Sequence, residues 1–349
     1  MGIRWHEQTL GARIVILVPM DRPAPELSVI VPTRDRRETV LATLAAIDRA
    51  AAGQAVEVVV ADDGSGDGTA AAIERAGAAL EIEVLCVRRA RAGGPAAARN
   101  AAVARARSPL LLFLGDDMAP RPGLIERHLR FHRRHPAGER ALIGLIAPAP
   151  GCDTPFARWL HECGKQFAFA EISAGAEVPV RLFYAANLSL KAELLARAGG
   201  FDERFEFGHE ERELGIRLER AGIRIDHDPE ALADHDHPTD LEATLRRMRG
   251  FGRSHRLLCR FDPAEPRPSR PAARHRLAAL ALTLPAVARV RAAPVRLRTW
   301  RFLCEQAARE AFWDELDPPD PAIRVGRRLA ELAARDPATG AAAAKPLSG

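Results

Sequence analysis

Residues 109–118 read PLLLFLGDDM and decide the fold class of this chain. Leu110 to Leu114 form a continuous apolar run bounded by a turn signal, which predicts a strand buried on both faces of a sheet. Asp116 and Asp117 follow at the carboxyl end of that strand. Ligands bind at this edge of open α/β sheets, so two adjacent carboxylates there indicate a hard divalent cation that holds phosphate oxygens. An acidic turn that caps a helix before Pro120 explains these residues equally well.

Segments with strand-like and helix-like patterns alternate along the first half of the chain. Apolar runs predict strands over residues 27–31, 56–61, 81–87, 110–114 and 141–147. Helical patterns predict helices that include residues 40–47, 96–107 and 123–135. Strands that alternate with helices in this way are joined by right-handed crossovers, so we expect an α/β domain built on a mainly parallel sheet.

Three of the predicted strands end in polar loops. The first is followed by Pro32-Thr33-Arg34-Asp35, the second by Asp62-Asp63 and the fourth by Gly115-Asp116-Asp117. Because parallel strands end at the same edge of a sheet, these side chains should gather along one line. This layout is typical of nucleotide-binding proteins.

The second half of the chain is less regular. Residues 181–190, RLFYAANLSL, predict a strand and a turn. Glu210 and Glu211 stand in the first turn of a predicted helix, where the helix dipole favours acids by about 0.3–1 kcal/mol each. The stretch Asp234-His235-Asp236-His237 offers two candidate metal ligands, and a basic helix is predicted from Leu241 to Leu258.

Three other histidines recur at helical spacing. His128, His132 and His135 stand at i, i+4 and i+7 and would share one face of a helix. That spacing suits a metal site, but no acids lie in register with them. We therefore expect a solvated surface face.

The composition excludes several classes of protein. At 349 residues the chain holds one large domain with an appendage, or two domains, and its 47% apolar and 28% charged content is that of an ordinary soluble protein. Five cysteines without CxxC spacing indicate neither a zinc site nor a disulfide framework. No apolar run reaches the ~18 residues that a membrane span needs, and no signal peptide is evident. We expect a cytoplasmic protein.

From Pro263 onward the chain is rich in Arg and Pro. Nine arginines and no acid lie between Pro266 and Cys304, in a chain of net charge +5. We favour a helical appendage packed on the main domain, with a disordered Ala-rich end. The alternative is that basic amphipathic pieces with Trp300 and Phe302 make peripheral contact with the inner face of the cell membrane. Nucleic acid is not an expected partner, because aromatic residues make up only 5% and no binding motif is present.

The order of motifs resembles the GT-A glycosyltransferases, specifically the large inverting family 2 that includes bacterial surface-polysaccharide transferases. The matching motifs are Ser28–Arg36, Val58–Ser65, Ala98–Asn100, Phe113–Asp117, Asn187–Lys191, Gly200–Glu203, Gly208–Leu214 and His235. The resemblance implies a GT-A fold, which is a Rossmann-like, mainly parallel mixed sheet flanked by helices. It places an N-terminal extension at residues 1–26, the GT-A domain at 27–262 and a basic helical C-terminal region at 263–349.

The resemblance also implies a donor site along the polar loops. The base and ribose of a sugar nucleotide would bind to Pro32, Thr33, Arg34, Asp35 and Asp62, with Asp63 beside them and Arg99 helping to hold the nucleotide. Asp117 falls on the last acid of the family's DxD motif, where Mn²⁺ or Mg²⁺ bridges the two phosphates. Gly115 replaces the first acid of that motif, so its contact falls to Asp116 or is lost. His235 falls on the late metal-associated histidine, and His237 is close enough to compete.

The resemblance assigns the general base to Glu211, which would deprotonate an acceptor hydroxyl as it attacks the anomeric carbon. The family commonly has Glu-Asp where this chain has Glu210-Glu211. The extra methylene moves the carboxylate by roughly 1.5 Å, and a displacement of that size can cost on the order of 100-fold in rate. Either the acceptor pocket is adjusted or Glu210 takes the role, and we favour Glu211.

We therefore expect a metal-dependent, inverting glycosyltransferase of hexosyltransferase type in bacterial cell-envelope polysaccharide biosynthesis. A UDP-sugar is favoured as donor over GDP- or dTDP-sugars, and the acceptor would be a saccharide or lipid-linked hydroxyl. A competing hypothesis is a non-catalytic GT-A-like subunit that binds nucleotide sugars or assists assembly, because the metal and base motifs are altered. A Rossmann dehydrogenase would need GxGxxG after the first strand, where Pro32–Asp35 stands instead.

Overall fold

The computed structural model describes residues 24–164, 166–172, 177–270 and 293–313. Its strands are β1 (Leu27–Thr33), β2 (Val56–Asp62), β3 (Glu83–Arg88), β4 (Leu110–Leu114), β5 (Met118–Pro120), β6 (Arg140–Pro148), β7 (Asn187–Lys191) and β8 (Arg224–His235). Its helices are α1 (Arg37–Ala51), α2 (Thr69–Gly77), α3 (Gly94–Val103), α4 (Leu124–Arg134), α5 (Pro155–Glu162), α6 (Ala192–Arg197), α7 (Glu210–Arg220), α8 (Leu241–Phe261) and α11 (Ala293–Trp313).

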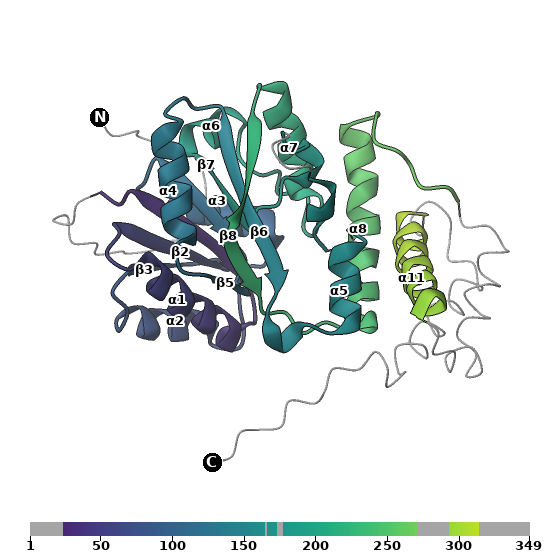
Figure 1. Cartoon of the computed structure of the whole chain (residues 1–349), viewed down its shortest axis with the longest axis horizontal. Coiled ribbons are helices and arrows are strands. Elements are labelled where there is room, and N and C mark those ends of the chain that lie inside the picture. The colour runs from purple at the N-terminus through teal and green to yellow at the C-terminus, as the bar shows by residue number, and fades with distance from the viewer. Residues whose placement is uncertain (1–23, 165, 173–176, 271–292, 314–349) are drawn as a thin grey trace, which may run out of the picture.

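The strands form one sheet in the order β3-β2-β1-β4-β7-β6-β8-β5 (Figure 1). β1 pairs in parallel with β2 and β4, β2 pairs in parallel with β3, and β6 pairs in parallel with β8. β7 pairs antiparallel with both β4 and β6. β5 pairs antiparallel with β8 and aligns Met118 with His235. The prediction of a mixed, mainly parallel sheet flanked by helices is confirmed.

The strand β4 is buried along its whole length, as its apolar run predicts. Leu111 and Phe113 join the core on the side of α3, α6 and α7, while Leu110, Leu112 and Leu114 join the core on the side of α1 and α4. Burial stabilises each such side chain by about 1.5–3 kcal/mol relative to an exposed position. The strand therefore ties the two helical layers together.

Two details of the predicted elements are wrong. Residues 181–190 do not start as a strand: a short 3₁₀ turn spans Val180–Leu182, and β7 begins only at Asn187. The turn at Asp116 and Asp117 leads directly into β5, so these acids do not cap a helix. The carboxylates thus remain at the edge of the sheet.

The helix α11 packs along α8 at one end of the molecule, beside α5 (Figure 1). Gly252 of α8 allows this approach, because a Cβ there would overlap the carbonyl oxygen of Ala308. Trp300 is buried, with its ring 4.9 Å from Phe156 and 5.5 Å from Trp159. This packing agrees with an appendage held on the main domain and places Trp300 in its core.

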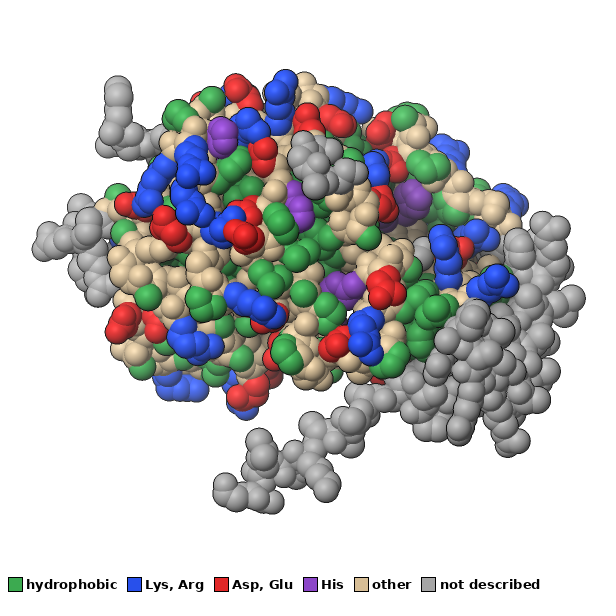
Figure 2. All heavy atoms as spheres, in the orientation of Figure 1, with side chains coloured by type: hydrophobic (Ala, Val, Ile, Leu, Met, Phe, Trp, Pro, Cys, Tyr) green, Lys and Arg blue, Asp and Glu red, His purple; other side chains and the backbone are tan. Residues whose placement is uncertain are grey.

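The domain boundaries at residues 26 and 262 stay predictions. Residues 1–23 of the predicted N-terminal extension and the predicted disordered end lie outside the described residues. Among the described residues, no helix combines the length and apolar character needed to cross a membrane. Basic and acidic side chains are interspersed on the face seen in Figure 2.

The expectation that His128 and His132 form a solvated face is wrong, because both are buried against β7. Asn187 donates its amide hydrogens to the carbonyls of Leu145 and Ala231, so its Oδ1 accepts from Nε2 of His128 at 3.1 Å. Nδ1 of His128 then accepts from the Ser189 hydroxyl at 2.7 Å, and Nε2 of His132 donates to that oxygen at 2.8 Å. With these donors and acceptors both imidazoles are neutral rings.

We predict that this network makes the fold sensitive to acid. Burial lowers the pKa of His128 to about 4 and the pKa of His132 to about 3. Because these folded-state values lie below the unfolded value, the stability is fully present above pH 6.5 and is lost as the pH falls toward 4. Urea unfolding should show that His128→Gln lowers the pH dependence between pH 7 and 4.5 by about 2 kcal/mol.

The control is His135→Gln, which changes a half-buried histidine just beyond the end of α4. It should keep the pH dependence of the unchanged protein. Equal pH dependence for His128→Gln and the unchanged protein would contradict the assignment of neutral buried rings.

Candidate active site

An open cleft with a volume of about 640 Å³ lies at the carboxyl ends of the central strands. Most of the predicted site residues line it: Pro32, Thr33, Arg34, Asp63, Arg99, Asp116, Asp117, Glu210, Glu211, His235 and His237. Asp35 and Asp62 do not line this cleft. The fold thus brings together loops that are more than 200 residues apart in the chain.

Asp117, His235 and His237 form one cluster. The pairing of β5 with β8 carries the end of β8 to the end of β4, and the backbone N–H of Asp236 donates to the carbonyl of Asp117 at 2.8 Å. Oδ2 of Asp117 lies 3.4 Å from Nε2 of His235 and 3.1 Å from Nδ1 of His237. One donor atom from each residue lies within 4.8 Å of the others. Two imidazoles and one carboxylate at this spacing make a candidate metal site.

The guanidinium of Arg36 lies against this cluster. It donates to Asp116 at 2.7 Å and to Asp117 at 3.1 Å, and its other Nη lies 3.3 Å from Nδ1 of His237. Burial alone would raise the pKa of Asp117, but His235, His237 and Arg36 hold it well below its usual range. Burial raises the pKa of Asp116 to about 6 despite Arg36. The carboxylate of Asp117 is therefore negatively charged at neutral pH and attracts cations.

Asp116 is tied into the protein on both sides. Its carboxylate accepts from the Thr33 hydroxyl at 2.7 Å, and its backbone carbonyl accepts from the Thr43 hydroxyl at 2.7 Å. A Cβ at Gly115, which stands where the family has an acid, would lie 2.9 Å from Oδ1 of Asp117, so a side chain there would have to displace that carboxylate. The missing acid at this position agrees with the place that the Asp117 carboxylate occupies.

The acids after β1 and β2 shape their loops. Oδ1 of Asp62 accepts from the backbone N–H of Ser65 at 3.1 Å, and Oδ1 of Asp35 accepts from that of Gly66 at 2.8 Å. Asp63 accepts from the backbone N–H groups of Gly93 and Gly94 at 3.0 and 2.8 Å, which holds the start of α3. The predicted contacts of these acids with a base and ribose remain predictions.

Arg99 joins the two acids at the start of α7. It donates to Oε1 of Glu210 at 2.8 Å and to Oε1 of Glu211 at 3.0 Å. The side chains of Arg99 and Glu210 are almost fully buried, whereas that of Glu211 is 24% exposed. The predicted role of Arg99 in holding a nucleotide therefore competes with its two ion pairs.

Glu211 presents one carboxylate oxygen to the cleft. Its Oε1 accepts from Arg99 and from the backbone N–H of Ala185 at 3.0 Å, and within the described residues no hydrogen bond reaches Oε2. Burial raises the pKa of Glu211 to about 7, with Glu210 adding to the rise and Arg99 opposing it. Such a carboxylate is poised to take a proton near neutral pH.

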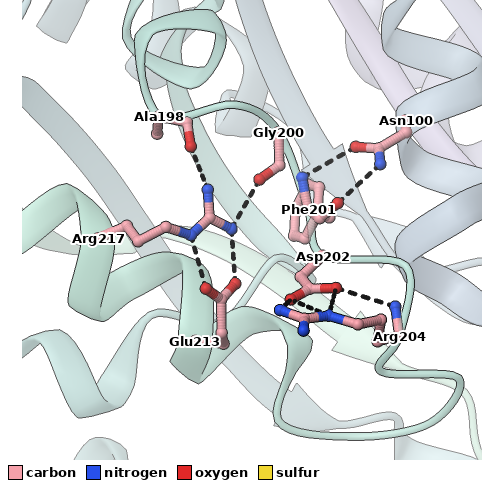
Figure 3. A network of polar contacts seen from close by, with 8 residues as sticks. All are labelled: Asn100, Ala198, Gly200, Phe201, Asp202, Arg204, Glu213 and Arg217. Carbon is pink, nitrogen blue, oxygen red and sulfur yellow. Dashed lines mark hydrogen bonds and ion pairs between the residues drawn. The ribbon is translucent and has the colours of Figure 1, made fainter. Parts of the chain in front are cut away.

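Polar contacts from α7 and α3 hold the segment that precedes α7 (Figure 3). Arg217 of α7 pairs with Glu213 and donates to the carbonyl of Gly200 at 2.8 Å. Asn100 of α3 donates to the carbonyl of Phe201 at 2.8 Å and accepts from its N–H at 2.9 Å. These bonds hold the segment from Ala198 to Phe201 against both α7 and α3, the helix that carries Arg99.

Arg247 is a cleft residue that the sequence did not single out. It lies on α8, donates to Oε1 of Gln166 and stacks over the Phe251 ring at 5.1 Å. Burial lowers its pKa, while Glu211 and Asp117 oppose that change. The helix is basic throughout, so nothing in its pattern distinguishes Arg247 from Arg246 or Arg249.

Residues 28–144 match the protein-family model described as glycosyl transferase family 2. The chain is 29% identical over 158 residues to pre-mycofactocin glycosyltransferase of Mycobacterium tuberculosis, covering 45% of this chain and 33% of that protein. It is 27% identical over 275 residues to validoxylamine A glucosyltransferase of Streptomyces hygroscopicus, covering 70% of this chain and 60% of that protein. The chain thus spans one third to three fifths of the length of these two relatives.

Two solved structures share the fold. One is the mannosyltransferase PcManGT of Pyrobaculum calidifontis in complex with GDP-Man and Mn²⁺, with a TM-score of 0.53, 19% identity and coverage of 92% of this chain and 86% of that one. The other is TarS of S. aureus, residues 1–349, in complex with UDP, with a TM-score of 0.50, 17% identity and coverage of 83% and 91%. At these identities the similarity establishes the fold alone.

We predict that Arg99→Gln destabilises the fold. Removing one partner of a buried ion pair leaves uncompensated charge, which costs about 3–5 kcal/mol. Urea unfolding at pH 7 measures the loss, and adding Glu210→Gln to Arg99→Gln should restore part of it. The exposed Arg91 supplies the control, since Arg91→Gln should change stability by less than about 0.5 kcal/mol. A loss below about 1 kcal/mol for Arg99→Gln would contradict the ion-pair account.

Proposed function

We propose that this chain, which carries a family 2 glycosyltransferase domain with a GT-A fold, moves a sugar from a nucleoside-diphosphate sugar to an acceptor hydroxyl with inversion. The observation that carries the proposal is that one cleft holds both the Asp117, His235 and His237 cluster and the Glu211 carboxylate. The first suits a bound diphosphate with its cation, and the second suits an acceptor that must lose a proton.

The proposed cofactor is Mn²⁺ or Mg²⁺, held by Asp117, His235 and His237. The fit rests on the mixed carboxylate and imidazole donors within 4.8 Å and on the guanidinium of Arg36, a cation already drawn to the same oxygens. When bound, such an ion neutralises charge on the departing nucleoside diphosphate. The Pyrobaculum mannosyltransferase, with GDP-Man and Mn²⁺, shares the fold and supports a metal-assisted donor site.

The proposed chemical step is a single displacement. Oε2 of Glu211 takes the proton of the acceptor hydroxyl, and the acceptor oxygen forms a bond to the anomeric carbon. The bond from that carbon to the phosphate oxygen breaks, and the diphosphate leaves with the electron pair. Arg99 holds Oε1 of Glu211 and so fixes the direction of Oε2. Attack opposite the leaving group inverts the anomeric configuration.

The proposal names the nucleotide, the acceptor and the location by class. UDP is favoured as the carrier, with GDP and dTDP as alternatives, and the acceptor is a saccharide or a lipid-linked hydroxyl. Domain boundaries at residues 27 and 262 and a cytoplasmic site of action, with peripheral contact at the membrane, stay part of the proposal.

We predict that Glu211→Gln abolishes turnover without abolishing donor binding. Gln keeps the shape of the side chain but cannot take a proton, so hydrolysis of the donor sugar nucleotide should fall by about 100-fold or more, while nucleotide affinity stays within about twofold. Hydrolysis is measured with UDP-, GDP- and dTDP-sugars and Mn²⁺. Glu211→Asp is the matched variant: it keeps a carboxylate but draws it back by roughly 1.5 Å, so it should lose part of the rate and still turn over faster than Glu211→Gln.

Two outcomes weigh against this assignment. Equal hydrolysis by Glu211→Gln and the unchanged protein would show that Glu211 is not the base, and Glu210→Gln would then be tested in the same way. Nucleotide binding without any hydrolysis or transfer in the unchanged protein would favour the competing non-catalytic subunit.

We predict that the rate follows the ionisation of Glu211. The base acts in its deprotonated form, and its pKa is raised to about 7 by burial. kcat/KM for donor hydrolysis should therefore rise about tenfold per pH unit below pH 6 and level off above pH 8. A profile that is flat from pH 5.5 to 8 would contradict a carboxylate base with this pKa.

A further inference from the structure

Phe207 is a large apolar side chain that stays exposed inside the cleft. Within the described residues, the two large apolar side chains with the widest exposure are Phe207 at 44% and Leu297 at 38%, and of these Phe207 lines the cleft. It stands four residues before Glu211 in the segment that leads into α7. Single exposed apolar residues are common, so the exposure alone does not define a site. The contacts that hold the Phe207 ring in place are what indicate a binding site.

One face of α8 forms a seat for the Phe207 ring. Gly250 makes the space, because a Cβ there would lie 2.5 Å from Cδ1 of Phe207. The Phe251 ring meets it edge to face, with centroids 5.7 Å apart and planes at 78°. The Ser254 hydroxyl donates to the backbone carbonyl of Phe207. Residues 250, 251 and 254 recur at the spacing of one helix face, so this face of α8 fixes the ring.

The segment around Phe207 is also fixed from the side of α3. Gly94 has φ +84°, and a Cβ there would overlap the carbonyl oxygen of Glu206. Gly208 has φ +76°, and a Cβ there would lie 3.1 Å from the Phe251 ring. The two glycines let the backbone pass tightly between α3 and α8. The exposed face of Phe207 is therefore preorganised, which lowers the entropy cost of binding.

The chemistry around the ring suits a sugar. An aromatic face is electron-rich and apolar, and the C–H face of a pyranose is apolar with slightly positive hydrogens, so the two surfaces attract each other. The hydroxyl edge of such a ring needs polar partners, and Glu206, Arg246 and Glu211 line the same cleft. A lipid chain would instead need a continuous apolar groove. The charged residues on either side of the Phe207 ring interrupt such a groove.

We propose that Phe207 is a stacking platform for a pyranose ring of the acceptor, so that the acceptor of this enzyme is a saccharide. The inference rests on the proposed function and names the class of its acceptor. Phe207 acts by holding the sugar ring, and Glu211 takes the proton from one of its hydroxyls. The ring contributes to acceptor affinity and has no part in nucleotide binding.

Saturation-transfer NMR tests the platform with defined sugars. The probes are the methyl glycosides of glucose, galactose, mannose and N-acetylglucosamine, each added to the full chain with UDP or GDP and Mn²⁺. We expect saturation of the C–H protons on one ring face of at least one glycoside. Phe207→Ala should weaken that binding about tenfold, the change that about 1.4 kcal/mol of lost contact produces. Phe207→Trp should retain it.

Two further variants separate the platform from a general loss of folding. Gly250→Ala keeps the Phe207 ring but pushes it from its seat, and it should weaken glycoside binding while the protein stays folded by circular dichroism. Leu297→Ala removes the other exposed apolar side chain and should leave glycoside binding unchanged.

The outcomes distinguish this inference from the proposed function. If a nucleotide binds but no glycoside does, or if glycoside binding is unchanged in Phe207→Ala, the platform is wrong and the donor site stands. If glycosides bind through Phe207 but none of the nucleotides binds, the platform stands and the proposed transfer fails.

Discussion

Carboxylates gathered at one edge of a sheet have to be neutralised, and this constraint governs the site. Arg36 lies between Asp116 and Asp117, and Arg99 lies between Glu210 and Glu211. Each arginine comes from a segment far in sequence from its acids, so the ion pairs also tie β1 to β4 and α3 to α7. Glu211, the most exposed of these acids, keeps one carboxylate oxygen that a ligand can reach.

The two acidic clusters differ in what they can do. His235 and His237 hold the carboxylate of Asp117 in its ionised form, which suits a permanent cation site. Burial and Glu210 favour the protonated form of Glu211 up to about pH 7, which suits a group that exchanges a proton. One cleft thus offers a charged end for a diphosphate and a proton-accepting end for a hydroxyl, with Phe207 at the entrance to α7. This division of roles is what the proposed transfer needs.

The sequence predicted the parts of the fold that depend on local pattern. The run at 110–114, five apolar residues before a turn signal, predicted a strand covered on both sides. The grouping of the polar loops after β1, β2 and β4 followed from the shared edge of parallel strands. The fold implied by the motif order is confirmed, and residues 28–144 match the model of the implied family, while the roles of the site residues stay predictions. Which faces of α4 and α8 are buried could not be predicted, because the residues that these helices contact lie far away in the sequence. His128 and His132 meet β7 about sixty residues later, and Arg247 faces a cleft built by earlier loops.

The central claim is that Asp117 anchors a metal-assisted site for a nucleoside diphosphate. Isothermal titration with UDP, GDP and dTDP, each with and without Mn²⁺, tests it most directly on the unchanged protein and on Asp117→Asn. The account predicts that one nucleotide binds with micromolar affinity only when Mn²⁺ is present, and that Asp117→Asn loses this binding. Binding that is equal without Mn²⁺ or equal in Asp117→Asn, or no binding of any of the three nucleotides, would contradict it.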